Sequence, residues 1–146
     1  METGVAAIEF AFVLVFMLFL AGGLVEFGRV LWYYNALAKA TRDGARYLSS
    51  SSSLDVSGAE ALAGAEAAAA GIASADFSVS VTCDGKSCPD PSSPGYAAPN
   101  YVRTVINLTG STGNIGTWMP LLLPEGGTAS FALALSPATT MRYLGE

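Results

Sequence analysis

An unbroken apolar run near the N-terminus is the first feature of the chain. Residues 5–25 contain a single charged side chain, Glu9, and their apolar residues occupy every face of a helix instead of one stripe. At 1.5 Å per residue this segment forms a helix of about 31 Å, which matches the ~30 Å hydrocarbon core of a bilayer. The pattern therefore predicts a transmembrane helix over residues 5–25.

After residue 25 the pattern changes to a repeat of three and four residues, which predicts an amphipathic extension of the same helix over residues 26–48. No proline interrupts residues 5–49, so a single rod of about 68 Å is expected. Glu26 and Arg29 stand three residues apart and are close enough to pair at the membrane interface. The residues expected on the apolar stripe are Val30, Tyr34, Leu37, Thr41, Ala45 and Leu48.

Residues 49–146 are expected to form a small α+β head. A serine run ends the rod at residues 49–53, and residues 59–73 form a short alanine-rich helix. Alternating apolar and polar positions predict half-buried strands over residues 77–82, 102–108 and 131–135. Long proline-containing connections separate them, which favours a three- to four-stranded antiparallel sheet lying on the rod.

Cys83 and Cys88 flank four residues at the end of the first expected strand. A disulfide is the preferred interpretation, and closing so short a loop contributes about 2 kcal/mol. The alternatives are a redox pair of thiols or two metal ligands. Both lack the usual two-residue spacing and any further Cys or His.

Composition narrows the function. The chain is 51% hydrophobic and only 13% charged, carries a net charge of −5, and contains no histidine. An acidic chain lacks the basic footprint of a nucleic-acid-binding protein, and without histidine the common catalytic triads and zinc sites have no ligands. We therefore expect no catalytic, cofactor-binding or metal site, no small-molecule substrate and no enzyme activity.

Glu9 is the most informative residue, because a carboxylate inside a spanning helix costs roughly 2.5 to 3.5 kcal/mol. In one interpretation Glu9 has no specific function: the helix N-terminus stabilises the anion, and the side chain reaches the membrane–water interface. The other requires a cation. If a peptidase cuts after Gly4, Val5 gains a free ammonium, and Glu9 of one subunit can pair with Val5 of its neighbour.

A secretory signal peptide is the alternative interpretation of the apolar run. Three features oppose it: no Lys or Arg precedes the run, Glu9 interrupts it, and the helical pattern continues well past a cut near Gly23.

Four segments carry a resemblance to a known family. The first, GVAAIEFA at residues 4–11, resembles the class III signal of type IV pilins and pseudopilins. Together with EFGR at residues 26–29, YNAL at 34–37 and ATRDGARY at 40–47, it resembles the TadE-like family of pilus assembly proteins. The closing ATTMRY segment is also similar to the usual ending of that family.

The resemblance implies a minor pseudopilin of the Tad (tight adherence, Flp-type) pilus, which serves cell adhesion. Gly4 and Val5 would flank the prepilin peptidase cut, and Glu9 with Phe10 would form the assembly contact. The implied partners are membrane lipid, other minor pilins or pseudopilins, the major Flp-type pilin, the prepilin peptidase and the inner-membrane pilus platform.

Topology also follows from the resemblance: one pass through the bacterial cytoplasmic membrane, with the N-terminus inside and the head outside. The basic residues after the span favour the opposite orientation by the positive-inside rule, whereas the cysteine pair favours an oxidising exterior.

Family leaders are typically longer and basic, but residues 1–4 include Glu2 and no Lys or Arg. We therefore expect an upstream start or a clipped leader.

The expected organisation is a leader remnant at residues 1–4, a transmembrane helix at 5–25, an amphipathic extension at 26–48 and an extracytoplasmic head at 49–146. The alternative function is an uncleaved, membrane-tethered binding or adhesion module that never assembles. In that module Glu9 is merely tolerated, so replacing it with alanine leaves function intact.

Overall fold

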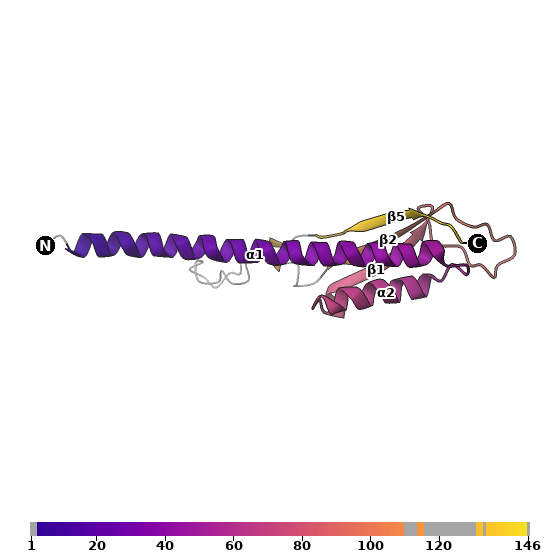
Figure 1. The fold of residues 1–146 in the computed structure, drawn as a ribbon, viewed down its shortest axis with the longest axis horizontal. Coiled ribbons are helices and arrows are strands. Elements are labelled where there is room, and N and C mark those ends of the chain that lie inside the picture. Colours follow the sequence, from indigo (N-terminus) through magenta and orange to yellow (C-terminus); the bar gives the residue numbers. More distant parts are fainter. Residues whose placement is uncertain (1–2, 110–113, 116–130, 133, 146) are drawn as a thin grey trace.

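A computed structural model describes residues 3–109, 114–115, 131–132 and 134–145. Helix α1 (Thr3–Ser50) runs the length of the molecule, and the other elements gather around its C-terminal half (Figure 1). The expected continuous rod is therefore present. At its end, the hydroxyl groups of Ser49 and Ser50 both donate to the Arg46 carbonyl, at 2.9 and 3.1 Å. The Ser50 hydroxyl also lies 3.3 Å from the Tyr47 carbonyl, an acceptor that the last turn leaves free.

Helix α2 (Val56–Ala69) packs against the C-terminal half of α1. Asp55 caps it, because its carboxylate accepts a hydrogen bond from the Gly58 N–H at 2.9 Å. The helix begins and ends earlier than residues 59–73. It stops before Gly71, whose φ of +85° is left-handed and terminates the helical path. The alanines buried on it recur every four residues: Ala59, Ala63 and Ala67.

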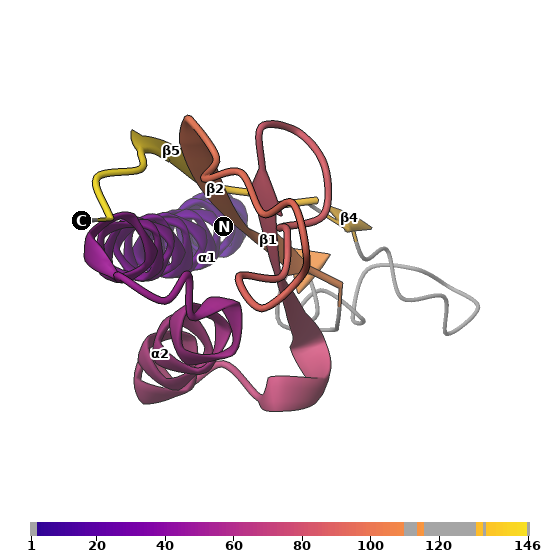
Figure 2. The same ribbon diagram turned by 90° about the vertical axis from the view of Figure 1, so that its right-hand side faces the viewer.

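The main sheet has three antiparallel strands, ordered β1 (Phe77–Cys83), β2 (Tyr101–Leu108) and β5 (Ala138–Arg142). A 3₁₀ turn, η1 (Ser74–Asp76), leads into β1. Viewed along α1, the sheet arches over both helices (Figure 2). The described residues thus form the expected α+β fold, with one layer of helices and one of strands.

The third strand of this sheet is not the one expected. Residues 131–135 do not supply it: β4 (Phe131–Ala132) pairs with β3 (Asn114–Ile115) in a separate two-stranded ladder. Leu133 lies outside the described residues, while Leu135 accepts a hydrogen bond from the Leu108 N–H at 3.0 Å. The sequence pattern missed β5 because its partly buried side chains are Thr139 and Met141, only one of which is apolar.

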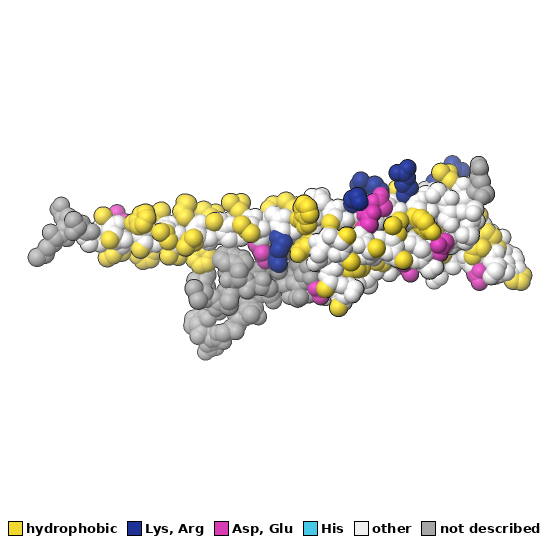
Figure 3. Space-filling view, turned by 60° about the horizontal axis from the view of Figure 1, so that its bottom comes forward, with side chains coloured by type: hydrophobic (Ala, Val, Ile, Leu, Met, Phe, Trp, Pro, Cys, Tyr) yellow, Lys and Arg dark blue, Asp and Glu magenta, His cyan; other side chains and the backbone are white. Residues whose placement is uncertain are grey.

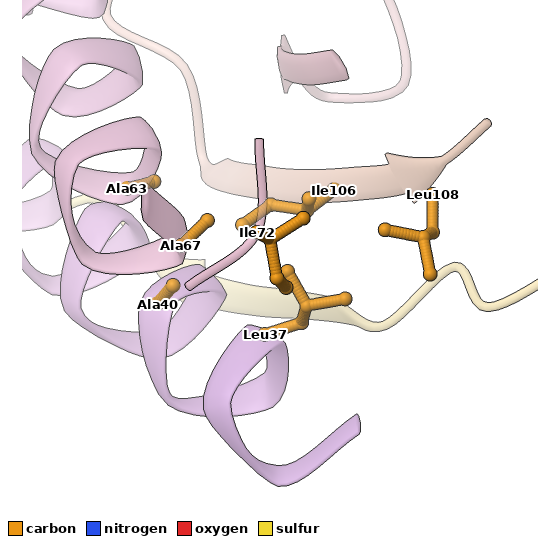
Figure 4. Close-up of a cluster of buried hydrophobic side chains, with 7 residues drawn as sticks. All are labelled: Leu37, Ala40, Ala63, Ala67, Ile72, Ile106 and Leu108. Carbon is orange, nitrogen blue, oxygen red and sulfur yellow. The ribbon is translucent and has the colours of Figure 1, made fainter. Parts of the chain in front are cut away.

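Two clusters of buried side chains form the core. The first joins both helices to β2 (Figure 4). The second lies nearer the end of α1 and includes Leu48, Val102 and Tyr143. Tyr143 ties the C-terminal segment to α1, because its hydroxyl donates to the Ser51 carbonyl at 2.7 Å. The first cluster consists of Leu37, Ala40, Ala63, Ala67, Ile72, Ile106 and Leu108.

Gly44 sits where α1, α2 and β2 come closest together. A Cβ atom at this position would lie 3.1 Å from the Ala63 Cβ and 3.2 Å from the Ala59 carbonyl oxygen. It would also lie 3.3 Å from the Thr104 Cγ2. The absence of a side chain therefore allows α1 to seat closely in the head.

The predicted apolar stripe of α1 agrees with the buried positions of the helix except at one residue. Tyr34 remains 46% exposed, whereas Tyr33 packs against the first core cluster. The reason is helical geometry: Tyr33 precedes Leu37 by one turn and Ala40 by two, which places it on their face. The remaining stripe residues are buried as expected: Val30, Leu37, Thr41, Ala45 and Leu48.

Candidate assembly and membrane interface

The N-terminal half of α1 extends beyond the described part of the head and carries apolar side chains over its surface (Figure 3). Phe10, Phe12 and Leu24 are 67%, 74% and 71% exposed. Of the helices that the structure describes, α1 is long and apolar enough to cross a membrane, and its most apolar stretch is not buried in the head at all. Such a surface calls for lipid or other apolar helices as its cover, because water cannot solvate it favourably.

Glu9 projects from this apolar surface near the start of α1. It is exposed, and no described residue donates a hydrogen bond or forms an ion pair with it. Its neighbours one residue either side are Ile8 and Phe10, both exposed and apolar. The chain as described therefore offers no internal cation for this carboxylate, and its pairing with another subunit remains a prediction.

Gly4 and Val5 lie in the first turns of α1 and are both exposed. No atom outside the helix backbone lies within 4 Å of a Cβ built at Gly4, so the head does not cover this segment. Cleavage between the two residues stays a prediction. Met1 and Glu2 of the expected leader lie outside the described residues.

Glu26 and Arg29 are in contact. Arg29 Nη2 donates to Glu26 Oε1, and the Glu26 side chain retains only 9% of its accessible surface. A buried carboxylate is stabilised by such a charged donor. The pair follows directly after the expected span, and its location at a membrane surface remains a prediction.

The aromatic residues after the span divide between two environments. Trp32 is 66% exposed and Tyr34 also faces outward, whereas Tyr33 contributes to the core. The outward pair suits an interface with headgroups or with another chain.

The basic side chains in the C-terminal half of α1 are only partly neutralised by ion pairs. They are Lys39, Arg42 and Arg46. Lys39 Nζ lies 2.9 Å from a Glu66 carboxylate oxygen on α2 and 3.3 Å from one of Asp43. These hydrogen bonds, first that to Glu66, raise the pKa of Lys39. Arg42 and Arg46 are exposed, and neither forms an ion pair with a described residue.

Cys83, the last residue of β1, forms a disulfide with Cys88. Cys83 and Lys86 exchange backbone hydrogen bonds around Asp84 and Gly85, whose φ angles of +50° and +76° are typical of a type I′ turn. The Asp84 carboxylate also accepts the Asn100 N–H at 2.9 Å. The disulfide and Asp84 thus hold the tip of the sheet together.

Within the described part of the chain, no group of three or more potential metal-binding side chains comes together. The acidic residues near the tip have structural tasks: Asp84 accepts backbone N–H groups, and Asp90 binds the Ser92 N–H at 2.8 Å. The hydrogen bonds from Ser92 lower the pKa of Asp90. The exposed apolar and basic surfaces of α1 are suited to binding other chains or lipid.

The role of Gly44 was missed at the sequence level. The sequence does contain a sign of this role: a glycine in the middle of a helical pattern destabilises the helix, and it is usually found there because another element packs closely against it. The unequal pairing of the basic residues after the span was also missed, because the sequence does not show that α2 places Glu66 beside Lys39.

Comparison with known proteins supports the family resemblance. Residues 4–46 match the family described as TadE-like protein, and this range covers α1 apart from its two ends. The resemblance is therefore confirmed over that segment. The family points to an association with the Tad pilus and is not an enzyme family. No curated protein and no solved structure matches the chain.

Proposed function

We propose that this chain, with its TadE-like segment at residues 4–46, is a minor pseudopilin that takes part in assembling a Tad (Flp-type) pilus. The observation that carries the proposal is the division of α1. Its matched segment includes an apolar half that is exposed between Gly4 and Val25 except at Phe19 and Gly22, which are partly buried, followed by a half seated in a small head. This is the form expected of a subunit anchored in a membrane and drawn into a filament by its helix.

In this function α1 has two successive environments. Residues 5–25 lie first in the cytoplasmic membrane, and the same apolar surface then packs against helices of neighbouring subunits. The head stays outside, where an oxidising compartment suits the Cys83–Cys88 disulfide. The prepilin peptidase and the inner-membrane platform are the proposed processing and assembly partners.

Glu9 supplies the register in this proposal. Cleavage after Gly4 gives Val5 an ammonium group, and the carboxylate of a neighbouring Glu9 neutralises it as both leave the lipid. Since no described residue of its own chain pairs with Glu9, the carboxylate is available for that contact.

A charge-removing variant tests the function. Glu9→Gln should strongly reduce surface pili, counted by electron microscopy of cells that carry the variant as the sole copy. Glu60→Gln, which removes a carboxylate from α2, is the matched control and should leave pili unchanged. Normal piliation with Glu9→Gln would contradict the assembly role and favour an uncleaved tethered module.

A further inference from the structure

Helix α1 carries a second continuous face, opposite the one that the head covers. Its members recur at steps of three and four residues and are all exposed, whereas Leu37 and Leu48 on the other side are fully buried. We call this face the outer stripe of α1. It consists of Leu24, Gly28, Leu31, Asn35, Lys39, Arg42 and Arg46.

The first part of the outer stripe is apolar and extends past the expected membrane. If residues 5–25 span the bilayer, Leu31 lies about 9 Å beyond the hydrocarbon core. It is nevertheless 45% exposed, and Trp32 beside it is 66% exposed. Trp32 and Lys39 also border a shallow open depression on this face, together with Asn35 and Ala36. Lipid tails do not reach this height, so the exposed side chain of Leu31 is suited to an apolar side chain of another protein as its cover.

The second part of the outer stripe is basic. Lys39 is bound by Glu66 and Asp43, but no described residue forms an ion pair with Arg42 or Arg46. These two arginines lie about 26 Å and 32 Å beyond Val25, several times the ~8 Å Debye length at physiological salt. Lipid headgroups are therefore too distant to neutralise them, and carboxylates on another protein are the fitting counter-charge.

A second copy of this chain that presents the same outer stripe does not supply that counter-charge. The outer stripe contains no Asp or Glu, so an identical stripe laid along it in parallel offers no carboxylate in any register. If the two stripes were aligned in register, Arg42 and Arg46 would face the same two arginines of the second copy, and like charges at such an interface are unfavourable.

We propose that the outer stripe docks a parallel helix from a different single-span subunit, with apolar side chains against Leu24 and Leu31 and carboxylates opposite Arg42 and Arg46. The stripe follows the three-four spacing of a coiled-coil seam over roughly six turns, which a straight partner helix matches. The inference deepens the proposed function, on which it rests for the parallel, membrane-anchored arrangement of the partner.

Site-specific crosslinking in the native cells tests this docking surface. A photoreactive amino acid replaces Asn35 in the full chain, and the irradiated adduct is identified by mass spectrometry. The same amino acid in place of Ser80, on the exposed face of β1, is the positional control. The expected adduct from position 35 contains a different single-span chain whose helix has Asp or Glu beyond its span.

Charge reversal then tests the arginines. R42E/R46E should reduce the adduct about tenfold or more, whereas R103E/R142E makes the same charge change on the sheet and should not. Arginine in place of the partner's facing carboxylates should restore the adduct to R42E/R46E. Resistance of the head to limited proteolysis, equal to that of the unchanged chain, verifies that each variant is folded.

Three outcomes would overturn the inference: an adduct only with a second copy, an adduct indifferent to R42E/R46E, or no protein adduct. Each is separable from failure of the proposed function. If Glu9→Gln abolishes pili but the residue at position 35 crosslinks to no acidic helix, the pseudopilin role is supported and the docking surface is contradicted.

Discussion

Leu24 and Leu37 are the same residue type on one continuous helix, yet Leu24 is 71% exposed and Leu37 is fully buried. Thirteen residues separate a surface that needs cover from outside the chain from one that the head already covers. Helix α1 is thus one continuous helix whose two halves have different surroundings. Its C-terminal half belongs to a folded head, and its N-terminal half exposes apolar side chains that no other described element covers.

The largest expected difference comes from deleting the same side chain in each half. Leu37→Ala should destabilise the head by about 2 to 5 kcal/mol, because it leaves a cavity in the first core cluster. Leu24→Ala should change head stability by less than about 0.5 kcal/mol, since that side chain is 71% exposed. Pulse proteolysis in urea of the detergent-solubilised full chain measures both. Equal shifts would contradict the division of α1.

Glycines offer a second matched pair. Gly44→Leu should cost about 1 to 3 kcal/mol, because the new side chain meets Ala63, Ala59 and Thr104 at once. Gly28→Leu enters open space and should leave the urea midpoint of the head unchanged or slightly higher. A tolerated leucine at position 44 would show that α1 and α2 are not closely seated.

Removing the disulfide should affect only the head. The Cys83→Ala/Cys88→Ala double variant should lose about 2 kcal/mol, the estimate for closing a loop this short. The helical content of α1 in detergent, followed by far-UV circular dichroism, should remain. Loss of the helical signal together with head stability would mean that the two halves unfold as one unit.

The smallest effect is a pH dependence at the start of α2. Hydrogen bonds from the Gly58 N–H, then from Ser57 and Tyr47, lower the pKa of Asp55 from its ordinary value of 3.8. Its contribution to stability is therefore present above pH 3.8 and is lost as the pH falls through the lowered pKa. Asp55→Asn should flatten the fall in urea midpoint between pH 5 and about pH 2. An unchanged pH profile would contradict this role of the cap.

Much of the fold could be predicted because it depends on local patterns. The apolar run, the three-four spacing and the absence of proline predict α1, and alternating residues predict β1 and β2. Strand β5 could not be found in this way, since Thr139 is held by a hydroxyl contact of 3.0 Å with Thr41, ninety-eight residues away in sequence. The close seating of Gly44 likewise depends on three elements meeting, which no local pattern records.

The candidate interface was predictable in its residues but not in its surroundings. Sequence identified Glu9 as a costly charge and placed Glu26 beside Arg29, and the described chain shows which of these acids has an internal partner. It did not distinguish Lys39, bound across the helices by Glu66, from Arg42 and Arg46. That distinction needs the position of α2.

The most direct test of the pseudopilin role is the identity of the mature N-terminus. Intact mass and N-terminal sequencing should be measured on the protein purified from its native membrane after co-expression with its prepilin peptidase. If the protein is a processed pseudopilin, the mature chain begins at Val5 and carries the ammonium group that a neighbouring Glu9 requires. A chain that retains Gly4 would lack that cation and would contradict assembly through Glu9.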